Sequence, residues 1–316
     1  MTAAITLIAL ALLRPASPER PVTIIAVGDI CLAGSVERSI SAHGDAYPFE
    51  HIRSAVAGAD IAFCNLECCL AVGGAPLAKR FTFRGRPARA RALKSAGFDI
   101  VSLANNHAWD YGKPAIRETV DAVRRAGLLC AGAGADLADA HALRIITVRG
   151  KRVGFLAYLG MFPALLPMRA REPAIAMGPP DVVSREVAAA RRQVDFLIVS
   201  IHAGVERSKR PSARQRAIAQ AAVDAGADVV LGHHPHVMQP METYRGKPIF
   251  YSLGNCVFPV SAQMASEGGK GWMGMAVIRL RSEAAPEGRL IELELHAGRP
   301  GLPRHRRAVR HQGVAH

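Results

Sequence analysis

The sequence is poor in aromatic residues and in lysine. Aromatic side chains make up 5% of its 316 residues, which disfavours a protein that binds single-stranded nucleic acid by stacking bases on aromatic rings. Lys and Arg number 40 against 26 Asp and Glu, a net charge of +14, and only seven of the cations are Lys. Such a surface suits a polyanion, whether phosphate, anionic lipid, polycarboxylate or nucleic acid. An Arg- and Ala-rich bias of the whole proteome is the alternative.

No apolar run in the sequence has the length of about 20 residues that a membrane-spanning helix needs. The apolar stretch 3–13 has the length of a signal-peptide core and precedes the Arg- and Pro-containing segment 14–18. We therefore predict that residues 1–20 are a signal peptide or N-terminal export anchor. The protein is then exported or membrane-associated on the outer face of the cytoplasmic membrane. No Lys or Arg precedes the stretch, and a short buried strand is the alternative.

The cysteines lack the paired spacing of a zinc knuckle or a disulfide framework. Their even number permits disulfides in an exported protein, but two of them, Cys64 and Cys256, lie in apolar, strand-like runs. A buried free thiol is the ordinary state of such a residue. We expect mostly structural thiols at the six positions, which are Cys31, Cys64, Cys68, Cys69, Cys130 and Cys256.

Short β-branched apolar runs alternate with helix-like segments, which predicts an α/β fold with buried strands. The chain is long enough for one large domain or two small ones. Expected helices open at a proline and close at a glycine over 87–97, 114–127 and 211–226. Residues 143–159 predict a hairpin, and 273–295 predict two antiparallel strands. We place one domain over 21–298 and a basic, disordered tail over 299–316. The expected strands are 22–27, 61–64, 100–103, 152–159, 196–201, 229–231 and 249–253.

Polar residues follow almost every one of these strands. They are Asp29, Asn65 and Glu67, Asn105 to His107, His202, His233 to His236 and Asn255. In an open α/β sheet, ligands bind beyond the carboxyl ends of the strands, so these side chains are expected at one rim. Carboxylate, amide and imidazole donors together suit one or two divalent transition metals such as Mn, Zn or Fe.

The same segments resemble the CapA family of poly-gamma-glutamate capsule biosynthesis proteins, itself similar to the calcineurin-like metallophosphoesterases. The likeness runs in order from about residue 22 to 258. It is carried by Gly28-Asp29-Ile30, Asn65-Leu66-Glu67, Ala104-Asn105-Asn106-His107 with Asp110-Tyr111-Gly112, Ser200-Ile201-His202, Gly232-His233-His234-Pro235-His236 and Tyr251-Ser252-Leu253-Gly254-Asn255. The resemblance implies an α-β-β-α sandwich of four layers, with two mixed sheets flanked by helices and a metal site at the strand ends.

The resemblance also implies a role for each residue of the site. Asp29 and His236 correspond to ligands of a first metal, and Glu67 takes the place of a bridging Asp. Three other residues, Asn106, His202 and His234, correspond to ligands of a second metal. His107 falls where the superfamily has a His that protonates a leaving group or holds a phosphoryl oxygen.

The sequence departs from the superfamily at the first metal. Its Asp-x-His motif here reads Asp29-Ile30-Cys31, so one imidazole is missing. Cys31 is a candidate extra ligand as a thiolate, which favours zinc or iron; a packed thiol is the alternative. The change puts the full metal occupancy and the hydrolytic activity in question.

Weaker candidates surround the site. We assign Arg84, Glu206 and Asn255 to substrate binding, with a solvated loop or surface carboxylate as the alternative for the first two. His233 is left over once His234 and His236 are taken as the ligand pair, and a structural or ligand-orienting role is expected for it.

Three functions from different classes follow. The first is a metal-dependent hydrolase of a phosphoester or of a bond in an acidic polymer. The second is a non-catalytic accessory factor of a membrane-bound polyglutamate synthase or export complex. The third, nucleic-acid binding, rests on charge alone and lacks any recognised motif. An anionic substrate or polymer is the expected partner, and no nucleic acid is expected.

Overall fold

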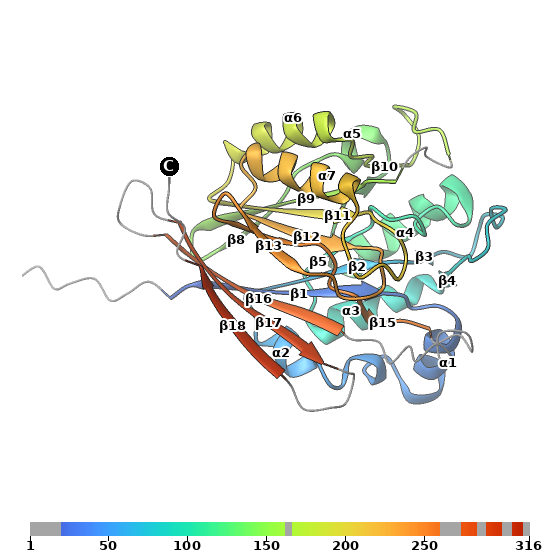
Figure 1. The fold of residues 1–316 in the computed structure, drawn as a ribbon. Helices are drawn as coiled ribbons and strands as arrows, with labels where there is room; N and C mark the ends of the chain where they lie inside the picture. The colour runs from blue at the N-terminus through green and yellow to red at the C-terminus, as the bar shows by residue number, and fades with distance from the viewer. Residues whose placement is uncertain (1–19, 162–165, 260–272, 283–288, 299–304, 312–316) are drawn as a thin grey trace, which may run out of the picture.

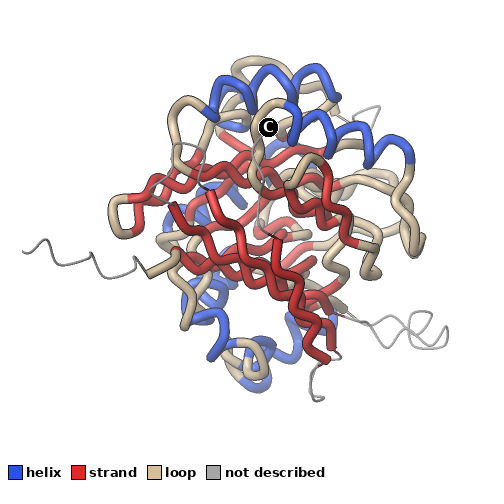
Figure 2. Tube along the Cα trace, turned by 60° about the vertical axis from the view of Figure 1, so that its left-hand side comes forward, coloured by secondary structure: helices blue, strands red, loops and turns tan. Residues whose placement is uncertain are grey.

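Two mixed β-sheets lie face to face in the middle of the molecule, and helices cover their outer faces (Figures 1 and 2). The computed structural model describes residues 20–161, 166–259, 273–282, 289–298 and 305–311. The two facing sheets with helices on their outer faces confirm the predicted four-layer sandwich. Within the described residues, no helix is long and apolar enough to cross a membrane.

The first sheet has the strand order β18-β17-β16-β1-β2-β5-β6, and β15 pairs with the end of β1. Four strands from β1 to β6 run parallel, and β16, β17 and β18 continue the sheet in antiparallel fashion. The strands are β1 (Val22–Ile30), β2 (Ile61–Leu66), β5 (Ile100–Ser102), β6 (Leu129–Ala131), β15 (Asn255–Val257), β16 (Met273–Ser282), β17 (Arg289–Gly298) and β18 (His305–His311).

The second sheet has the order β13-β14-β12-β11-β9-β8, with antiparallel strands at its two edges. Its strands are β8 (Arg144–Val148), β9 (Lys151–Leu159), β11 (Phe196–His202), β12 (Val229–His233), β13 (Met241–Tyr244) and β14 (Lys247–Phe250). Two small pairs complete the strands: β3 (Cys69–Leu70) with β4 (Arg84–Gly85), and β7 (Ala133–Gly134) with β10 (Ala174–Ile175).

The helices lie outside both sheets. In Figure 1, α6 and α7 lie above the six-stranded sheet, and α1 and α2 lie below the eight-stranded one. Ser212 and Gln215 form a capping box that starts α7, and Gly97 ends α3 at a φ of 105°. The helices are α1 (Gly34–His43), α2 (Arg53–Ala57), α3 (Ala90–Ala96), α4 (Gly112–Arg125), α5 (Leu137–Ala140), α6 (Pro180–Arg191) and α7 (Ala213–Asp224), with 3-10 turns η1 (Tyr47–Phe49) and η2 (Pro87–Arg89).

Strand β11 illustrates why the sequences of the central strands are continuous apolar runs. Side chains alternate between the two faces of a strand. Phe196 and Ile198 join the core between the sheets, whereas Leu197 and Val199 pack in the core that includes residues of α6 and α7. Both faces are therefore buried. Between the sheets, Phe63 of β2 stacks on Phe155 of β9 with ring centroids 6.0 Å apart.

Gly28 near the end of β1 allows a close backbone approach beside the candidate site. A Cβ atom at this position would lie 1.9 Å from the carbonyl oxygen of Gly254. The neighbouring residue, Asp29, donates its backbone N–H to the same oxygen at 2.8 Å. Only glycine lets the 254 loop meet the strand here, and this contact places Asn255 opposite Asp29.

Several local predictions are confirmed and one is wrong. The predicted hairpin is formed by β8 and β9, and the two antiparallel strands after residue 272 are β16 and β17. All six cysteines are buried and free. The predicted disordered tail, however, contains β18, which pairs along β17 and gains its order from that ladder. Residues 1–19, 299–304 and 312–316 lie outside the described residues, so the N-terminal export prediction is not addressed by the fold.

Candidate metal centre

The predicted side chains converge because the parallel strands of both sheets end at one rim. Asp29 of β1 lies opposite Asn65 of β2, and His202 of β11 lies opposite His233 of β12. Strands β1 and β12 are themselves in contact. Residues that are more than 200 positions apart in the sequence thus become neighbours, as for Asp29 and His233, whose side chains lie 3.1 Å apart.

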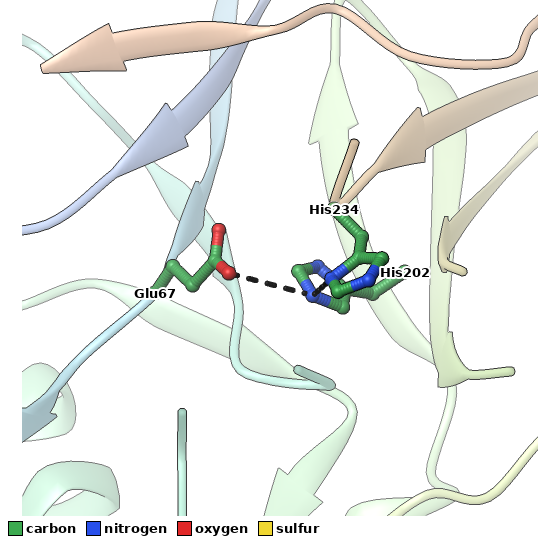
Figure 3. A group of neighbouring side chains, drawn as sticks. All are labelled: Glu67, His202 and His234. Carbon is green, nitrogen blue, oxygen red and sulfur yellow. Dashed lines mark hydrogen bonds and ion pairs between the residues drawn. The ribbon is translucent and has the colours of Figure 1, made fainter. Parts of the chain in front are cut away.

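Glu67 belongs to two groups of potential metal ligands. One group is Glu67, His202 and His234, and the other is Asp29, Glu67 and His236; within each group the ligand atoms lie within 4.8 Å of one another. Figure 3 shows the Glu67 carboxylate facing the two rings of the first group. A carboxylate common to two groups is the arrangement expected of a residue that bridges two cations.

The first group is built around the His202 ring. Its Nε2 lies 3.5 Å from Glu67 Oε1, 2.7 Å from Asn106 Oδ1 and 3.2 Å from His234 Nδ1. The structure therefore brings together all three residues predicted for the second metal, and places Glu67 beside them.

The second group joins Asp29, Glu67 and His236. Nδ1 of His236 lies 3.4 Å from Asp29 Oδ2, and its Nε2 lies 3.8 Å from Glu67 Oε1. Asn255 Oδ1 lies 2.9 Å from the same Nδ1. Asn255 was predicted to bind substrate, and its contact in the structure is with the imidazole of a candidate ligand. Such a contact fixes the orientation of the ring.

Two fully buried residues, Asn65 and His233, contact the acidic side chains of the site. Nδ2 of Asn65 donates to Asp29 Oδ1 at 2.8 Å and to Glu67 Oε2 at 3.5 Å, and lies 3.3 Å from His202 Nδ1. His233 Nδ1 lies 3.1 Å from Asp29 Oδ1. Each therefore contacts a candidate ligand, and His233 has the ligand-orienting position expected for it.

The pKa values of the two buried carboxyl groups shift in opposite directions. Burial alone would raise the pKa of Asp29, but hydrogen bonds from His233 and His236 hold it well below its ordinary value. The pKa of Glu67 is raised well above its ordinary value by burial and then by the negative charge of Asp29. Asp29 is thus held in its ionised form by its histidine partners, whereas burial and the Asp29 charge disfavour the ionised form of Glu67.

The imidazoles of the first group are neutral. Burial, followed by the neighbouring His234, puts the pKa of His202 well below its ordinary value. Burial also lowers the pKa of His234 to about 4. Neutral imidazole is the form that binds metals. The pKa of His236 is raised although burial opposes this, because Asp29 accepts a hydrogen bond from its ring.

These residues fit a divalent metal. Glu67 Oε1 is buried and has no hydrogen-bond partner, although leaving a buried acceptor unsatisfied costs about 1–3 kcal/mol. The atom lies between imidazole nitrogens of two groups, where a cation would satisfy it. His234 and His236 have positive φ angles of 100° and 60°. Strained non-glycine backbone of this kind clusters at functional sites.

His107 lies at the edge of this cluster, held by a buried carboxylate. Its Nδ1 is 2.7 Å from Asp110 Oδ2. Lys79 Nζ donates to Asp110 Oδ1 at 2.5 Å and to the Asn106 carbonyl oxygen at 2.7 Å. Burial lowers the pKa of His107, against the effect of Asp110. Asp110 and Lys79 thus connect the candidate acid to a candidate ligand.

The remaining candidates lie at different distances from the centre of the site. Glu206 is exposed, but its charge raises the pKa values of Glu67 and His236, so it lies near the rim. The contacts of Arg84 are with the Tyr111 ring, 4.1 Å away, and the Val72 carbonyl oxygen rather than with the cluster. Cys31 is buried against Cys68, and burial raises the pKa of its thiol.

Three contributing residues received no separate role from the sequence. Asn65 had an available signal, since it lies in β2 two residues before Glu67, which directly follows the end of that strand. Asp110 lies three residues after His107 in a polar motif, which is also a local signal. Lys79 had none, because its partners are about 30 residues away in the sequence.

Comparisons with known proteins agree with the fold. The family described as bacterial capsule synthesis protein PGA_cap matches residues 23–260. The chain is 34% identical over 244 residues to capsule biosynthesis protein CapA of Bacillus anthracis, covering 75% of this chain and 59% of that protein. It is 31% identical over 235 residues to PGA biosynthesis protein CapA of Bacillus subtilis (strain 168), covering 73% and 62%. The chain thus spans about three fifths of the length of these relatives.

A third relative and a solved structure extend the comparison. A probable polyglutamine synthesis accessory protein of Mycobacterium tuberculosis is 33% identical over 210 residues, covering 63% of this chain and 55% of that protein. The NAD nucleotidase NadN of Haemophilus influenzae superposes with a TM-score of 0.51 at 11% identity, covering 92% of this chain and 50% of that one. The latter likeness shows the fold alone.

The low pKa of His234 gives a pH-dependent prediction for the metal-free protein. We expect the ring to stay neutral from pH 7 to 5 and to titrate at about pH 4 because it is buried. The unfolded chain, with an ordinary pKa of about 6.5, takes up this proton first. The contribution of His234 to stability is therefore complete above pH 6.5 and is lost as the pH falls toward 4. An NMR titration in EDTA, assigned with His234→Asn, measures the midpoint; a midpoint of about 6.5 or higher contradicts the burial argument.

Proposed function

The chain belongs to the bacterial capsule synthesis protein family PGA_cap, and from this membership we propose that it acts in making a poly-gamma-glutamate capsule polymer. We further propose that the strand-end cluster is a divalent-metal site that hydrolyses a phosphoester or a bond in an acidic polymer. The observation that carries the second proposal is the buried oxygen of Glu67, which has no hydrogen bond and is shared by two ligand groups.

The proposed ligands divide between two positions. Asp29, Glu67 and His236 would hold one ion, and Glu67, Asn106, His202 and His234 would hold the other, with Mn, Zn or Fe as candidates. A bound metal pair supplies an acidified water at neutral pH and a clamp for the oxygens of the reacting group.

The protein's own residues would orient the substrate and move the proton. The hydrogen bond from His107 Nδ1 to Asp110 fixes the ring and leaves Nε2 as the nitrogen that exchanges a proton with the leaving oxygen. Lys79 neutralises the buried Asp110, so the carboxylate can support the ring without an unpaired charge. The excess of basic residues favours an anionic substrate.

A non-catalytic accessory role is the second candidate. The observation that favours it is Cys31, which stands where the superfamily motif has an imidazole and whose thiol pKa is raised by burial. A weaker first metal position would bind an anionic chain end without hydrolysing it. In that role the protein would assist membrane-bound components of a polyglutamate synthase.

Metal content tests the site directly. We expect the purified protein to contain at least about one equivalent of Mn, Zn or Fe that chelation removes. Glu67→Gln should weaken metal affinity by at least about tenfold, because it removes a shared charged ligand. Elemental analysis and metal titration measure both. The control is Glu186→Gln, whose carboxylate also contacts a histidine, His141, outside the cluster. Less than one equivalent, unaffected by chelation, would rule out the metal site.

His107→Ala tests the acid. We expect turnover on a panel of phosphoesters and acidic polymers to fall by about 10²- to 10⁴-fold, with metal content unchanged. His141→Ala is the matched control, because His141 is likewise paired with a carboxylate, at 2.9 Å. Equal turnover by wild type and His107→Ala would remove the acid role. Metal binding with no turnover on any substrate would favour the accessory function.

Export remains part of the proposal. We expect residues 1–18 fused to a reporter that is active only outside the cytoplasm to give a signal, because this segment has the length and apolar character of a signal-peptide core. The same reporter fused to residues 21–40 is the control. A fusion without signal, produced at the same level, would place the protein on the cytoplasmic side.

A further inference from the structure

Three phenylalanines form a continuous wall beside the candidate metal centre. Phe83 lies 4.5 Å from the His107 ring and 5.5 Å from the Phe258 ring. Phe258 lies 4.8 Å from the His236 ring. Phe81 stacks parallel to Phe83, with an interplanar angle of 5° and centroids 6.5 Å apart. We call Phe81, Phe83 and Phe258 the aromatic wall; it connects the candidate acid to a candidate ligand.

The wall is built on fixed backbone. The N–H of Phe83 donates to Asp110 Oδ2 at 2.6 Å, and its carbonyl oxygen accepts from the Cys69 N–H at 3.0 Å. Phe83 and Phe258 are half-buried and pack against the main core. Asp110 thus contacts both His107 and Phe83, so one carboxylate positions the candidate catalytic histidine and the neighbouring phenylalanine.

Phe81 differs from the other two rings because it does not pack against the main core. It is 45% exposed and follows two basic residues, Lys79 and Arg80. The guanidinium of Arg80 lies 5.0 Å from the centre of its ring. An aromatic ring that stacks on the wall and remains open to solvent offers a surface on which another planar group can stack. A guanidinium beside it also stacks on planar groups.

The proposed role of His107 indicates which part of the substrate would lie beside the aromatic wall. In the proposed function, on which this inference rests, His107 exchanges a proton with the leaving oxygen. The substituent on that oxygen must therefore lie on the His107 side of the site, where Phe83 contacts the ring. We propose that the aromatic wall is a leaving-group subsite, and that the substrate is a phosphoester with a planar aromatic substituent. The phosphoryl group lies toward the ligand groups, and the substituent stacks along Phe83 and Phe81.

Phosphonates test the subsite by binding alone, since their carbon–phosphorus bond is not hydrolysed by such a site. We compare phenylphosphonate, cyclohexylphosphonate and methylphosphonate on the metal-loaded full chain by calorimetry. Phenyl and cyclohexyl groups are similar in size, but only the first is planar. We expect phenylphosphonate to bind about three- to tenfold more tightly than cyclohexylphosphonate, the value of one favourable ring pair.

Variants of Phe81 test whether the aromatic wall is the source of the preference for phenylphosphonate. Phe81→Leu should reduce the ratio of the two affinities to about one, because it keeps an apolar side chain but removes the ring. Phe81→Tyr should keep the ratio. Tyr47→Leu is the matched control, since Tyr47 is also 45% exposed and stacks on His43. Unchanged methylphosphonate binding in all variants shows that the metal centre is intact.

The possible results distinguish a failure of the aromatic subsite from a failure of the proposed phosphoester site. If phenyl- and cyclohexylphosphonate bind equally to the wild type, the aromatic subsite is overturned while the phosphoester site stands. A preference that survives Phe81→Leu also overturns it, because the wall is then not its source. If no phosphonate binds to metal-loaded protein, the proposed phosphoester site fails and the subsite fails with it. A preference lost in Phe81→Leu and kept in Phe81→Tyr and Tyr47→Leu supports the proposal.

Discussion

The structure depends on the burial of one carboxyl group, that of Glu67, with an oxygen that no protein group satisfies. Removing such a group from water is unfavourable unless a partner replaces the water. Burial and the neighbouring charge of Asp29 accordingly raise the pKa of Glu67. A divalent cation would stabilise the ionised carboxylate at this position and so lower its pKa. The two sheets must face each other with their strand ends aligned for this to happen, because the ligands come from both.

Much of this arrangement is present in the sequence as a pattern. Each buried strand is a short apolar run, and the polar residues directly after it are brought to one rim by the rule that parallel strands share their carboxyl ends. This reasoning correctly places Asp29, His202 and His234. It does not give the partners of each side chain. Lys79 contacts Asp110 across 31 residues, and no local pattern indicates which basic residue of that loop turns inward.

Two other differences have simple physical causes. The tail 299–316 was predicted to be disordered because it is rich in Pro, Gly and Arg, but β18 within it pairs with β17, which supplies the backbone hydrogen bonds that this composition does not favour. Arg84 was expected to bind anions because of its basic neighbours. In the structure its guanidinium lies over Tyr111, and stacking on a ring is an interaction that arginine makes as readily as it binds an anion. Charge in a loop indicates the sign of a surface, not the contact of each residue.

Asn65, which received no role from the sequence, and Asn255, which was assigned to substrate binding, each lie against the imidazole of a candidate ligand. His202 directs Nδ1 toward Asn65, so Nε2 is the atom that faces Glu67 and Asn106. His236 directs Nδ1 toward Asn255 and Asp29, so Nε2 is the atom nearer Glu67. At His236 the acceptor oxygens of Asn255 and Asp29 favour a proton on Nδ1, which leaves the Nε2 lone pair for a cation. At His202 the Asn65 amide instead donates toward Nδ1. Residues that orient metal ligands change metal affinity by about 10- to 100-fold, so under the proposed function Asn65 and Asn255 would contribute to metal binding together with the imidazoles they contact.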